Sequence, residues 1–424
     1  MPTLLPQALA SPATWILCIL SFVLILWRPR GIAEYWWASG GAILLVGLGL
    51  LPLHEAGASV RAGTSVYLFL SGMMLLADLA RQHGLFDWLA SQALRLSRDS
   101  QSRLFALIFG IGVVVTALMS NDATAVLLTP AVLAVVRRTK TSPLPYLFTC
   151  AFIANAASFV LPISNPANLV VFDGQMPPLG AWLAMFLLPA AGAIGMTFLV
   201  LRWRFRHELA SPLVDGVPPA PLRLHGKRAG IGILIAAAGL LATSAMGGPI
   251  GPATLIAGLA VLVFVGRTDW RLMRNAASDV SWGVLPLVAS LFVLVGALEH
   301  AGALRLCVAG LAAAARLPNF LHLAAISFVI GGAANAINNL PMGLIAASAL
   351  HAAKAGSAEH AAALLGINLG PNLSVTGSLA TILWLIALRR ENLQIGARHF
   401  LREGIFLMPL ALLTGIGLLT LLVR

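Results

Sequence analysis

Charged residues are the class that this sequence has least of. Only 10% of its 424 residues are Asp, Glu, Lys or Arg, while 59% are hydrophobic. Soluble domains carry about a quarter charged residues, so this composition excludes an ordinary water-soluble fold. It favours a chain whose surface faces lipid over most of its area.

Cysteine is also scarce, and its three occurrences are scattered. Cys18, Cys150 and Cys307 lie in separate apolar segments and form neither a CxxC pair nor a cluster with histidine. We therefore expect no disulfide framework, no metal site and no cofactor. The motifs HExxH, GxSxG and GxxxxGKS/T are absent from the sequence, so we expect neither an enzyme nor an ATPase site in this chain.

Long apolar runs take the place of the missing charges. Residues 15–27, 40–53, 181–201 and 405–423 approach or reach the ~20 residues that a membrane-spanning helix needs. None of these runs alternates with a period of two, which disfavours a β-barrel. The sequence therefore predicts an all-α polytopic membrane protein.

The sequence also repeats itself once. Three pairs of residues align when the chain is shifted by 218 residues, or by 213 for the last pair: Gly84 with Gly302, Asn121 with Asn339, and Asn155 with Asn368. Both halves then hold the same order of parts, which is a spanning helix, an amphipathic stretch, an Asn-centred break and a second break inside a longer apolar segment. We expect an N-terminal half at 1–201, a cytoplasmic linker at 202–228 and a C-terminal half at 229–424.

The Asn-centred breaks fall inside apolar segments that are short. The arms on either side of residues 120–122 have only about 14 to 16 residues, and at 1.5 Å per residue neither comfortably crosses a ~30 Å core. We therefore expect re-entrant hairpins at 104–136 and 321–353, with two full crossings per hairpin as the alternative. Broken helices are expected at 146–176 and 361–388.

The basic residues set the orientation. If the hairpin at 104–136 lies on the cytoplasmic side and the one at 321–353 on the outside, 22 of the 27 Lys and Arg residues face the cytoplasm. The net charge of +12 is then explained by topological anchors, and no nucleic-acid partner is expected. This topology has about ten transmembrane helices in two inverted repeats, the usual plan of secondary carriers, in the cell's inner membrane.

Four polar breaks interrupt the membrane segments, and each precedes an apolar helical stretch. Backbone inside a bilayer must line a cavity or be buried in protein, and a polar side chain at such a place can cap the next helix. Four helix starts near the midplane would offer free N–H groups and partial positive charge to a solute. A purely capping role is the alternative, but repetition in both halves favours a binding site. The candidate substrate-binding residues are Ser120, Asn121, Asn165, Asn168, Asn338, Asn339, Thr376, Gly377 and Ser378.

Asp122 is the single residue in these breaks that most strongly suggests a function. A carboxylate within a membrane segment is costly and points to function. The repeat mate of Asp122 is Leu340, so the symmetry of the fold does not require an acid there. We predict that Asp122 couples transport to protons. The alternative is that it only favours the helix N-terminus that it begins.

These residues resemble the ion-transporter superfamily, and most closely the arsenite/antimonite efflux permeases, also called arsenical pump membrane proteins. The strings that carry the resemblance are SNDATAVLLTPAVLAVV, ISNPANLVVF, NNLPMGLIAASAL and LGPNLSVTGSLATILWL. The resemblance covers roughly residues 64 to 423, and the last string is its most specific part. One departure is Asn155, where arsenite permeases often have Asp.

The resemblance implies export of trivalent arsenic or antimony hydroxides, driven by proton uptake. For some members it also implies a soluble arsenite-stimulated ATPase subunit as a partner. The candidate site residues agree in part with such a substrate. Arsenous acid is neutral at pH 7 and presents only hydroxyls, which Asn, Ser and Thr groups could bind. The alternative is a sodium- or proton-coupled carrier of another small oxyacid or carboxylate.

A cysteine introduced at Ser211 tests the predicted orientation. Segment 202–228 carries many basic residues and divides the two halves, so it should lie in the cytoplasm. In a background without the three native cysteines, which we expect to be dispensable, Ser211→Cys should resist a membrane-impermeant thiol reagent in intact cells. A cysteine at Arg61, on the predicted outer side, should react. Labelling at position 211 from outside would overturn the orientation.

Overall fold

The computed structural model describes residues 7–139, 141–172, 176–211, 213, 221–266 and 280–423, with side chains from residue 10 onward. Within these ranges every regular element is a helix. Several features used for the predicted orientation lie outside the described residues: Lys140, Arg267, Arg271, Arg274, Arg424 and residues 214–220 of the expected linker.

The first half contains eleven principal helical elements. They are α1 (Gln7–Trp27), α2 (Glu34–Gly47), α3 (Leu53–Ala62), α4 (Thr64–Gln82), α5 (Leu85–Leu96), α6 (Gln101–Leu118), η2 (Ala123–Leu128), α7 (Thr129–Arg138), α8 (Leu144–Ala156), α9 (Pro166–Val171) and α10 (Leu179–Arg204). Short 3₁₀ turns occur at Pro29–Gly31, Pro162–Ser164 and Glu208–Ala210.

The second half follows the same order over its described residues. Its elements are α11 (Leu224–Ala245), α12 (Ile250–Gly266), α14 (Val284–His300), α15 (Ala303–Ala314), α16 (Asn319–Ile337), α17 (Asn339–Ala352), α18 (Ser357–Leu369), η5 (Gly370–Leu373), α19 (Leu379–Arg390) and α20 (Ala397–Leu422). Gly84, between α4 and α5, and Gly302, between α14 and α15, both adopt positive φ, 70° and 93°, a conformation that costs glycine little.

The lengths of the helices fit a multi-pass membrane protein. In the described part of the chain six helices are long and apolar enough to span a bilayer, or up to eight if each bent pair, α3–α4 and α14–α15, counts as one span. The all-α membrane fold predicted from composition is thereby confirmed. The expected total of about ten includes α2, α12 and the two broken helices, whose separate pieces are shorter. Because α6 and α16 are among the six, their length fits a full crossing as well as a hairpin arm.

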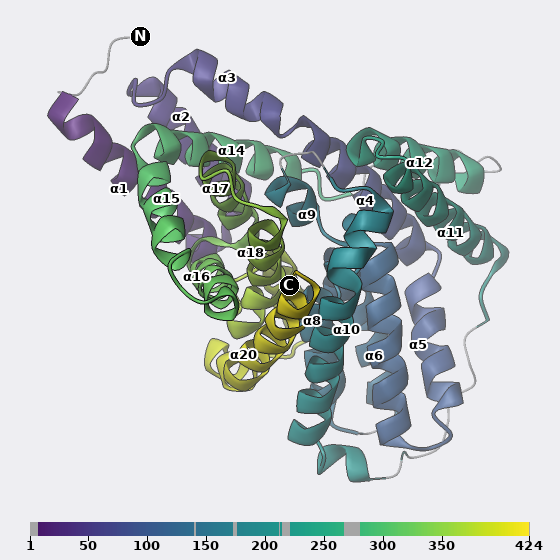
Figure 1. Ribbon diagram of the computed structural model, residues 1–424. Helices are drawn as coiled ribbons and strands as arrows, with labels where there is room; N and C mark the ends of the chain where they lie inside the picture. The colour runs from purple at the N-terminus through teal and green to yellow at the C-terminus, as the bar shows by residue number, and fades with distance from the viewer. Residues whose placement is uncertain are drawn as a thin grey trace.

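The two halves exchange their opening helices. Helix α12 of the second half packs along α4 of the first, and α2 of the first half packs along α14 of the second (Figure 1). Helix α3, which contacts α14, carries the chain across the top of Figure 1 from one group of helices to the other. The first helices of each half therefore pack against the other half of the chain. The alignment of the two halves in the sequence did not reveal this arrangement.

Glycines bring α4 and α12 into backbone contact. A Cβ added to Gly72 would lie 2.2 Å from the carbonyl oxygen of Thr254, and one added to Gly258 would lie 2.8 Å from the carbonyl oxygen of Gly72. Small residues at membrane helix interfaces allow this close approach, and the packing between the helices supplies the stability. The exchange of opening helices therefore depends on these glycines.

Helices α10 and α20 also pack together and support the centre of the molecule. Arg204 Nε lies 2.8 Å from Glu403 Oε2, whose side chain is 1% exposed. A Cβ on the neighbouring Gly404 would lie 2.1 Å from the carbonyl oxygen of Asn372, so α20 lies directly against the break after α18. This contact leaves the backbone of the break little room to move toward α20.

Replacing Gly72 by Ala should destabilise the protein. The added methyl group has no space against Thr254, and overpacking of this kind costs about 1–3 kcal/mol. The melting temperature in detergent should fall. Gly239→Ala on α11 is the matched control, because a methyl group added there would meet no atom within 4 Å, and it should leave the melting temperature unchanged. Equal melting temperatures for the two variants would contradict the proposed backbone contact.

Candidate functional site

Each of the four polar breaks supplies an oxygen that caps the helix behind it. The four bonds run from Ala123 N to Ser120 Oγ at 3.1 Å, from Ala167 N to Asn165 Oδ1 at 2.9 Å, from Leu340 N to Asn338 Oδ1 at 3.4 Å, and from Thr381 N to Ser378 Oγ at 3.2 Å. The capping predicted from the sequence is confirmed. Each cap satisfies one N–H group. At α9 the Asn168 N–H also bonds the Asn165 carbonyl oxygen, and at α17 the Asn339 N–H bonds the Gly377 carbonyl oxygen, so the first turns after Ser120 and Ser378 are better placed to offer N–H groups to a ligand.

The first tip, residues 120–122, holds two groups without a protein partner. Asn121 is 3% exposed, and its Oδ1 makes no hydrogen bond within the described residues. Asp122 is half-buried and has neither a hydrogen bond nor an ion pair in that part of the chain. The π-helical turn η2 follows at once, a feature frequent at functional sites. A buried acceptor without a partner is costly, so Asn121 is suited to receive a donor from a solute.

The second tip is bonded to the second break of its own half. Asn338 Nδ2 donates to the carbonyl oxygen of Thr376 at 3.4 Å, and the Asn339 N–H donates to the carbonyl oxygen of Gly377 at 2.9 Å. Asn338 adopts φ 79° and ψ 153°, a region that few residues other than glycine occupy. Four of the predicted site residues are thus brought together.

The second break rests on two residues that sequence reasoning missed. The Ser374 hydroxyl donates to Asn335 Oδ1 at 2.6 Å, and the Thr376 hydroxyl donates to the Asn335 carbonyl oxygen at 2.7 Å. Asn335 Nδ2 in turn donates to the Gly370 carbonyl oxygen at 2.9 Å. The repeat mate of Asn335 is Ala117, so the repeat gave no signal for this residue.

Asn155 connects the first half to the second break. Its Nδ2 donates to Asn372 Oδ1 at 2.9 Å and lies 3.4 Å from the Thr381 hydroxyl. The hydroxyl of Ser378, the cap of α19, donates to Asn155 Oδ1 at 3.1 Å. Asn155 is 1% exposed, so these bonds are made in a dry environment.

Asn368, the repeat mate of Asn155, makes the reciprocal connection. Asn165, the cap of α9, donates from Nδ2 to Asn368 Oδ1 at 2.8 Å, and the Ser158 hydroxyl donates to the same oxygen. Asn368 Nδ2 donates to Asn168 Oδ1 at 3.2 Å. The side chains that make these bonds across the halves also include Ser158 and Thr381. We give the name amide lattice to the five asparagines among them and the cap Ser378: Asn155, Asn165, Asn168, Asn368, Asn372 and Ser378. The 213-residue offset that pairs Asn155 with Asn368 was the signal that could have placed both in the candidate site.

The helical segments that follow the two tips show the same crossed pattern. The turn η2 packs against α19 of the other half, and α17 packs against α9 of the other half. No hydrogen bond joins Asn121 directly to Asn339 within the described residues. The hydrogen bonds that link the two tips therefore run through the breaks.

The two breaks differ in exposure. Asn165 and Asn168 in the first break are at most 2% exposed. Asn338, Ser374 and Thr376 around the second break are half-buried. Polar groups at membrane depth must face water or protein, because lipid cannot hydrogen-bond them. The surroundings of the second break are therefore more accessible than those of the first break in this conformation.

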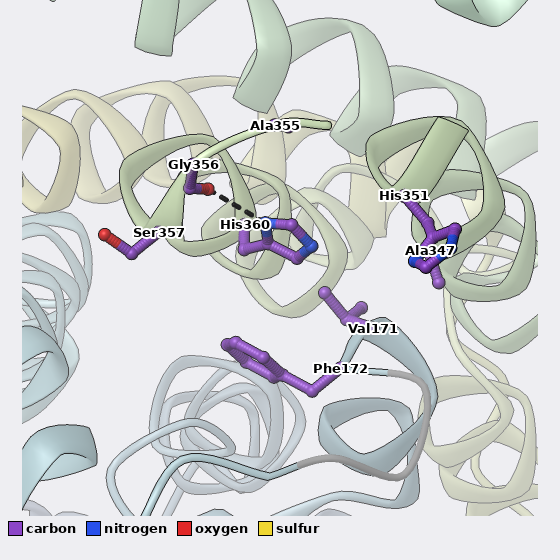
Figure 2. A pocket seen from close by; sticks show the side chains of 8 residues that line it. All are labelled: Val171, Phe172, Ala347, His351, Ala355, Gly356, Ser357 and His360. Atoms are coloured by element: carbon purple, nitrogen blue, oxygen red, sulfur yellow. Dashed lines mark hydrogen bonds between the residues drawn. The ribbon is translucent and has the colours of Figure 1, made fainter. Parts of the chain in front are cut away.

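A cavity of about 300 Å³ lies between α9, α17 and α18, at the end of α17 opposite Asn339. Its lining residues, drawn in Figure 2, are Val171, Phe172, Ala347, His351, Ala355, Gly356, Ser357 and His360. His360 Nδ1 lies 2.8 Å from the Gly356 carbonyl oxygen, and the His360 ring stacks on Phe172 with 5.9 Å between centroids. A Cβ on Gly343 would lie 3.4 Å from Val170, so the contact of α9 with α17 separates this cavity from the second tip.

Asn168 and Asn121 should respond differently to truncation. Asn168→Ala removes the acceptor of Asn368 and the donor to the Ser158 carbonyl oxygen at 2.9 Å, which should cost about 1–3 kcal/mol and lower the melting temperature in detergent. Asn121→Ala removes an oxygen that has no protein partner, so the melting temperature should stay unchanged. A comparable loss of stability in both variants would show that Asn121 is structural.

Known proteins similar to this chain are membrane transport proteins. The arsenical pump membrane protein of Escherichia coli K12 is 26% identical over 416 residues, covering 93% of this chain and 95% of that protein. The putative arsenical pump membrane protein of Bacillus subtilis is 24% identical over 430 residues, with the same two coverages. The resemblance predicted from the four sequence strings is confirmed.

Two solved structures share the fold. The Alcanivorax borkumensis YdaH transporter superimposes with a TM-score of 0.57 at 16% identity and covers 87% of both chains. Neisseria gonorrhoeae MtrF, described as illuminating a class of antimetabolite efflux pumps, superimposes with a TM-score of 0.54 at 13% identity over 98% of this chain and 95% of that one. The family model described as "Citrate transporter" matches residues 22–368. The chain therefore belongs to the citrate transporter family and is a multi-pass membrane transporter.

Proposed function

We propose that this transporter exports trivalent arsenic or antimony hydroxides from the cytoplasm across the inner membrane in exchange for protons. One observation carries the proposal. The bonds that join the breaks involve only amides, hydroxyls and backbone groups, while the first tip holds a single carboxylate, Asp122, without a cationic partner among the described residues.

The neutral character of the breaks suits an uncharged polyol-like solute. Arsenous and antimonous acids present hydroxyl groups that both donate and accept hydrogen bonds. The free Asn121 oxygen would accept from one hydroxyl, and the N–H groups at the half-helix starts would donate to others. Arg137, at the end of the first hairpin, lies 2.6 Å from Glu391, so its charge is already engaged away from the tip.

Asp122 provides a route for coupling. An ionised carboxylate at the tip accepts a hydrogen bond from a substrate hydroxyl, while a protonated one no longer offers that charged acceptor. Proton uptake at Asp122 and substrate binding beside it therefore compete, which is the requirement for exchange transport. Asp78 is a weaker choice for this role, because Arg81 lies 2.6 Å from its carboxylate and holds it in an ion pair.

A second candidate is a sodium- or proton-coupled carrier of another small oxyacid or carboxylate. The description of the family as citrate transporters favours it, and half-helix N-termini can hold a carboxylate without a basic side chain. Inverted membrane vesicles with an imposed pH gradient separate the candidates. Accumulation of arsenite and antimonite, but not of citrate or dicarboxylates, supports metalloid export, and the opposite pattern would replace it.

A soluble arsenite-stimulated ATPase subunit is the partner that we propose for the cytoplasmic face. Exposed basic side chains gather at the ends of α10 and α19, among them Arg202, Arg206, Arg389 and Arg390. These ends would offer an acidic surface of such a subunit a complementary docking area. Proton-driven export by the chain alone does not require this partner.

Asp122→Asn should uncouple transport from the proton gradient. The amide keeps the size of the side chain but cannot exchange a proton near neutral pH. Gradient-driven accumulation of arsenite in inverted vesicles should collapse, while arsenite binding to the purified variant persists. Asp87→Asn on α5 is the control, because that carboxylate lies outside the breaks, and it should transport normally. Wild-type accumulation by Asp122→Asn, with unchanged pH dependence, would move the proton to another group.

A further inference from the structure

Two of the four breaks, those that begin α9 and α19, are each held by an asparagine from the opposite half. Asn155, in the last turn of α8, bonds Ser378, which begins α19. Asn368, in the last turn of α18, bonds Asn165, which begins α9. The repeat offset of 213 residues converts the first bond into the second, since it carries Asn155 onto Asn368 and Asn165 onto Ser378.

The crossed bonds bring opposite helix ends together. The carbonyl end of α8 carries partial negative charge and lies beside α19, whose N-terminus carries partial positive charge. The ends of α18 and α9 are in contact in the same way. Neither pair belongs to one half, so separating the halves would leave four helix ends and their amides without partners in a dry core.

Hydrogen bonds continue from the breaks to both tips. On the second side, the Thr376 and Gly377 carbonyl oxygens hold Asn338 and Asn339. On the first side, the Ser164 hydroxyl donates to the Ala117 carbonyl oxygen at 2.9 Å, one turn before the first tip. Asn368 and Asn372 are one turn apart and receive both links from the first half. The path from one tip to the other is therefore continuous through the amide lattice.

We propose that Asn155 and Asn368 are positioning residues that tie the breaks at Ser378 and Asn165 to the opposite half, so that the two tips bind one solute as a single site. Asn121 and Asn339 are not bonded to each other, so their relative placement depends on this lattice. The inference rests on the proposed function for the choice of arsenite as the probe.

Double-mutant cycles test the crossed connection. Asn155→Ala and Ser378→Ala are made singly and together, as are Asn368→Ala and Asn165→Ala. Arsenite affinity is measured by calorimetry on purified full-length protein in lipid nanodiscs, and melting temperature is measured on the same samples. Each single variant should weaken arsenite binding by about tenfold. The double variant of a bonded pair should bind arsenite no more weakly than the more severely affected of its two single variants, because both changes break the same connection.

Pairs within one half are the matched controls. Asn155→Ala with Asn165→Ala, and Asn368→Ala with Ser378→Ala, break two different connections, so their losses of affinity should multiply. Additive effects in the crossed pairs as well would overturn the proposal. So would wild-type arsenite affinity in either single Asn variant. If the melting temperature falls but the crossed pairs show no coupling in arsenite affinity, Asn155 and Asn368 have only a structural role.

Carboxylate variants keep the test decisive if an alanine variant does not fold. Asn155→Asp retains the acceptor for Ser378, and the Asn372 amide can turn to donate to it only by releasing the Phe152 carbonyl oxygen at 3.2 Å. Asn368→Asp places a second acceptor against the Leu364 carbonyl oxygen, to which Asn368 Nδ2 donates at 2.9 Å and which cannot rotate away. Asn155→Asp should therefore lose less arsenite affinity than Asn368→Asp, which should lose at least about tenfold. The reverse order would overturn the assigned bonds.

Absence of arsenite binding by the wild-type protein would overturn the proposed export function and not the lattice. In that case the double-mutant cycles are evaluated from melting temperatures alone, and these decide whether Asn155 and Asn368 have the positioning role. Coupling in the crossed pairs, and its absence in the pairs within one half, would support it. Equal coupling in both kinds of pair would overturn it.

Discussion

The interruption of helices inside a bilayer is the constraint on which this structure depends. Lipid offers no hydrogen bonds, so every peptide group released by a break must find a partner in the protein or in a water-filled space. Here Asn165 and Ser378 accept from backbone N–H groups of the helices that they begin, and Asn368 and Asn155 of the opposite half bond those two capping side chains. The breaks supply the polar groups for a solute, and the same requirement forces the two halves together around them.

The rest of the fold holds the halves in that position. Exchange of the opening helices places α12 on α4 and α2 on α14, and glycines such as Gly72 let the first of these contacts reach backbone distance. Helix α20 supports the second break through Gly404. A transporter must move parts of its structure past one another, and these contacts surround the breaks with packed helices.

A symmetric framework carries asymmetric chemistry in this protein. Asp122 has no acidic counterpart in the other half, because Leu340 occupies the equivalent position in the repeat. The first break is sealed while the second is half-exposed, and the cavity beside His351 and His360 is separated from the second tip by the contact of α9 with α17. Inverted repeats related by an axis in the membrane plane would exchange such environments when the structure changes state.

The sequence by itself determined the membrane environment, the order of elements and the four capped breaks. Hydropathy and capping are local, so Ser120, Asn165, Asn338 and Ser378 can be identified without knowing what surrounds them. The repeat even aligned Asn155 with Asn368, although their bonding partners lie more than 200 residues away and no local pattern indicates them. Only the tertiary structure decided that the opening helices are exchanged, that Asn335 and Ser374 support the second break, and that the caps Asn165 and Ser378 are bonded by the opposite half. Those outcomes depend on which polar surfaces meet when the halves pack, and many chain arrangements with the same hydropathy would satisfy the bilayer equally well.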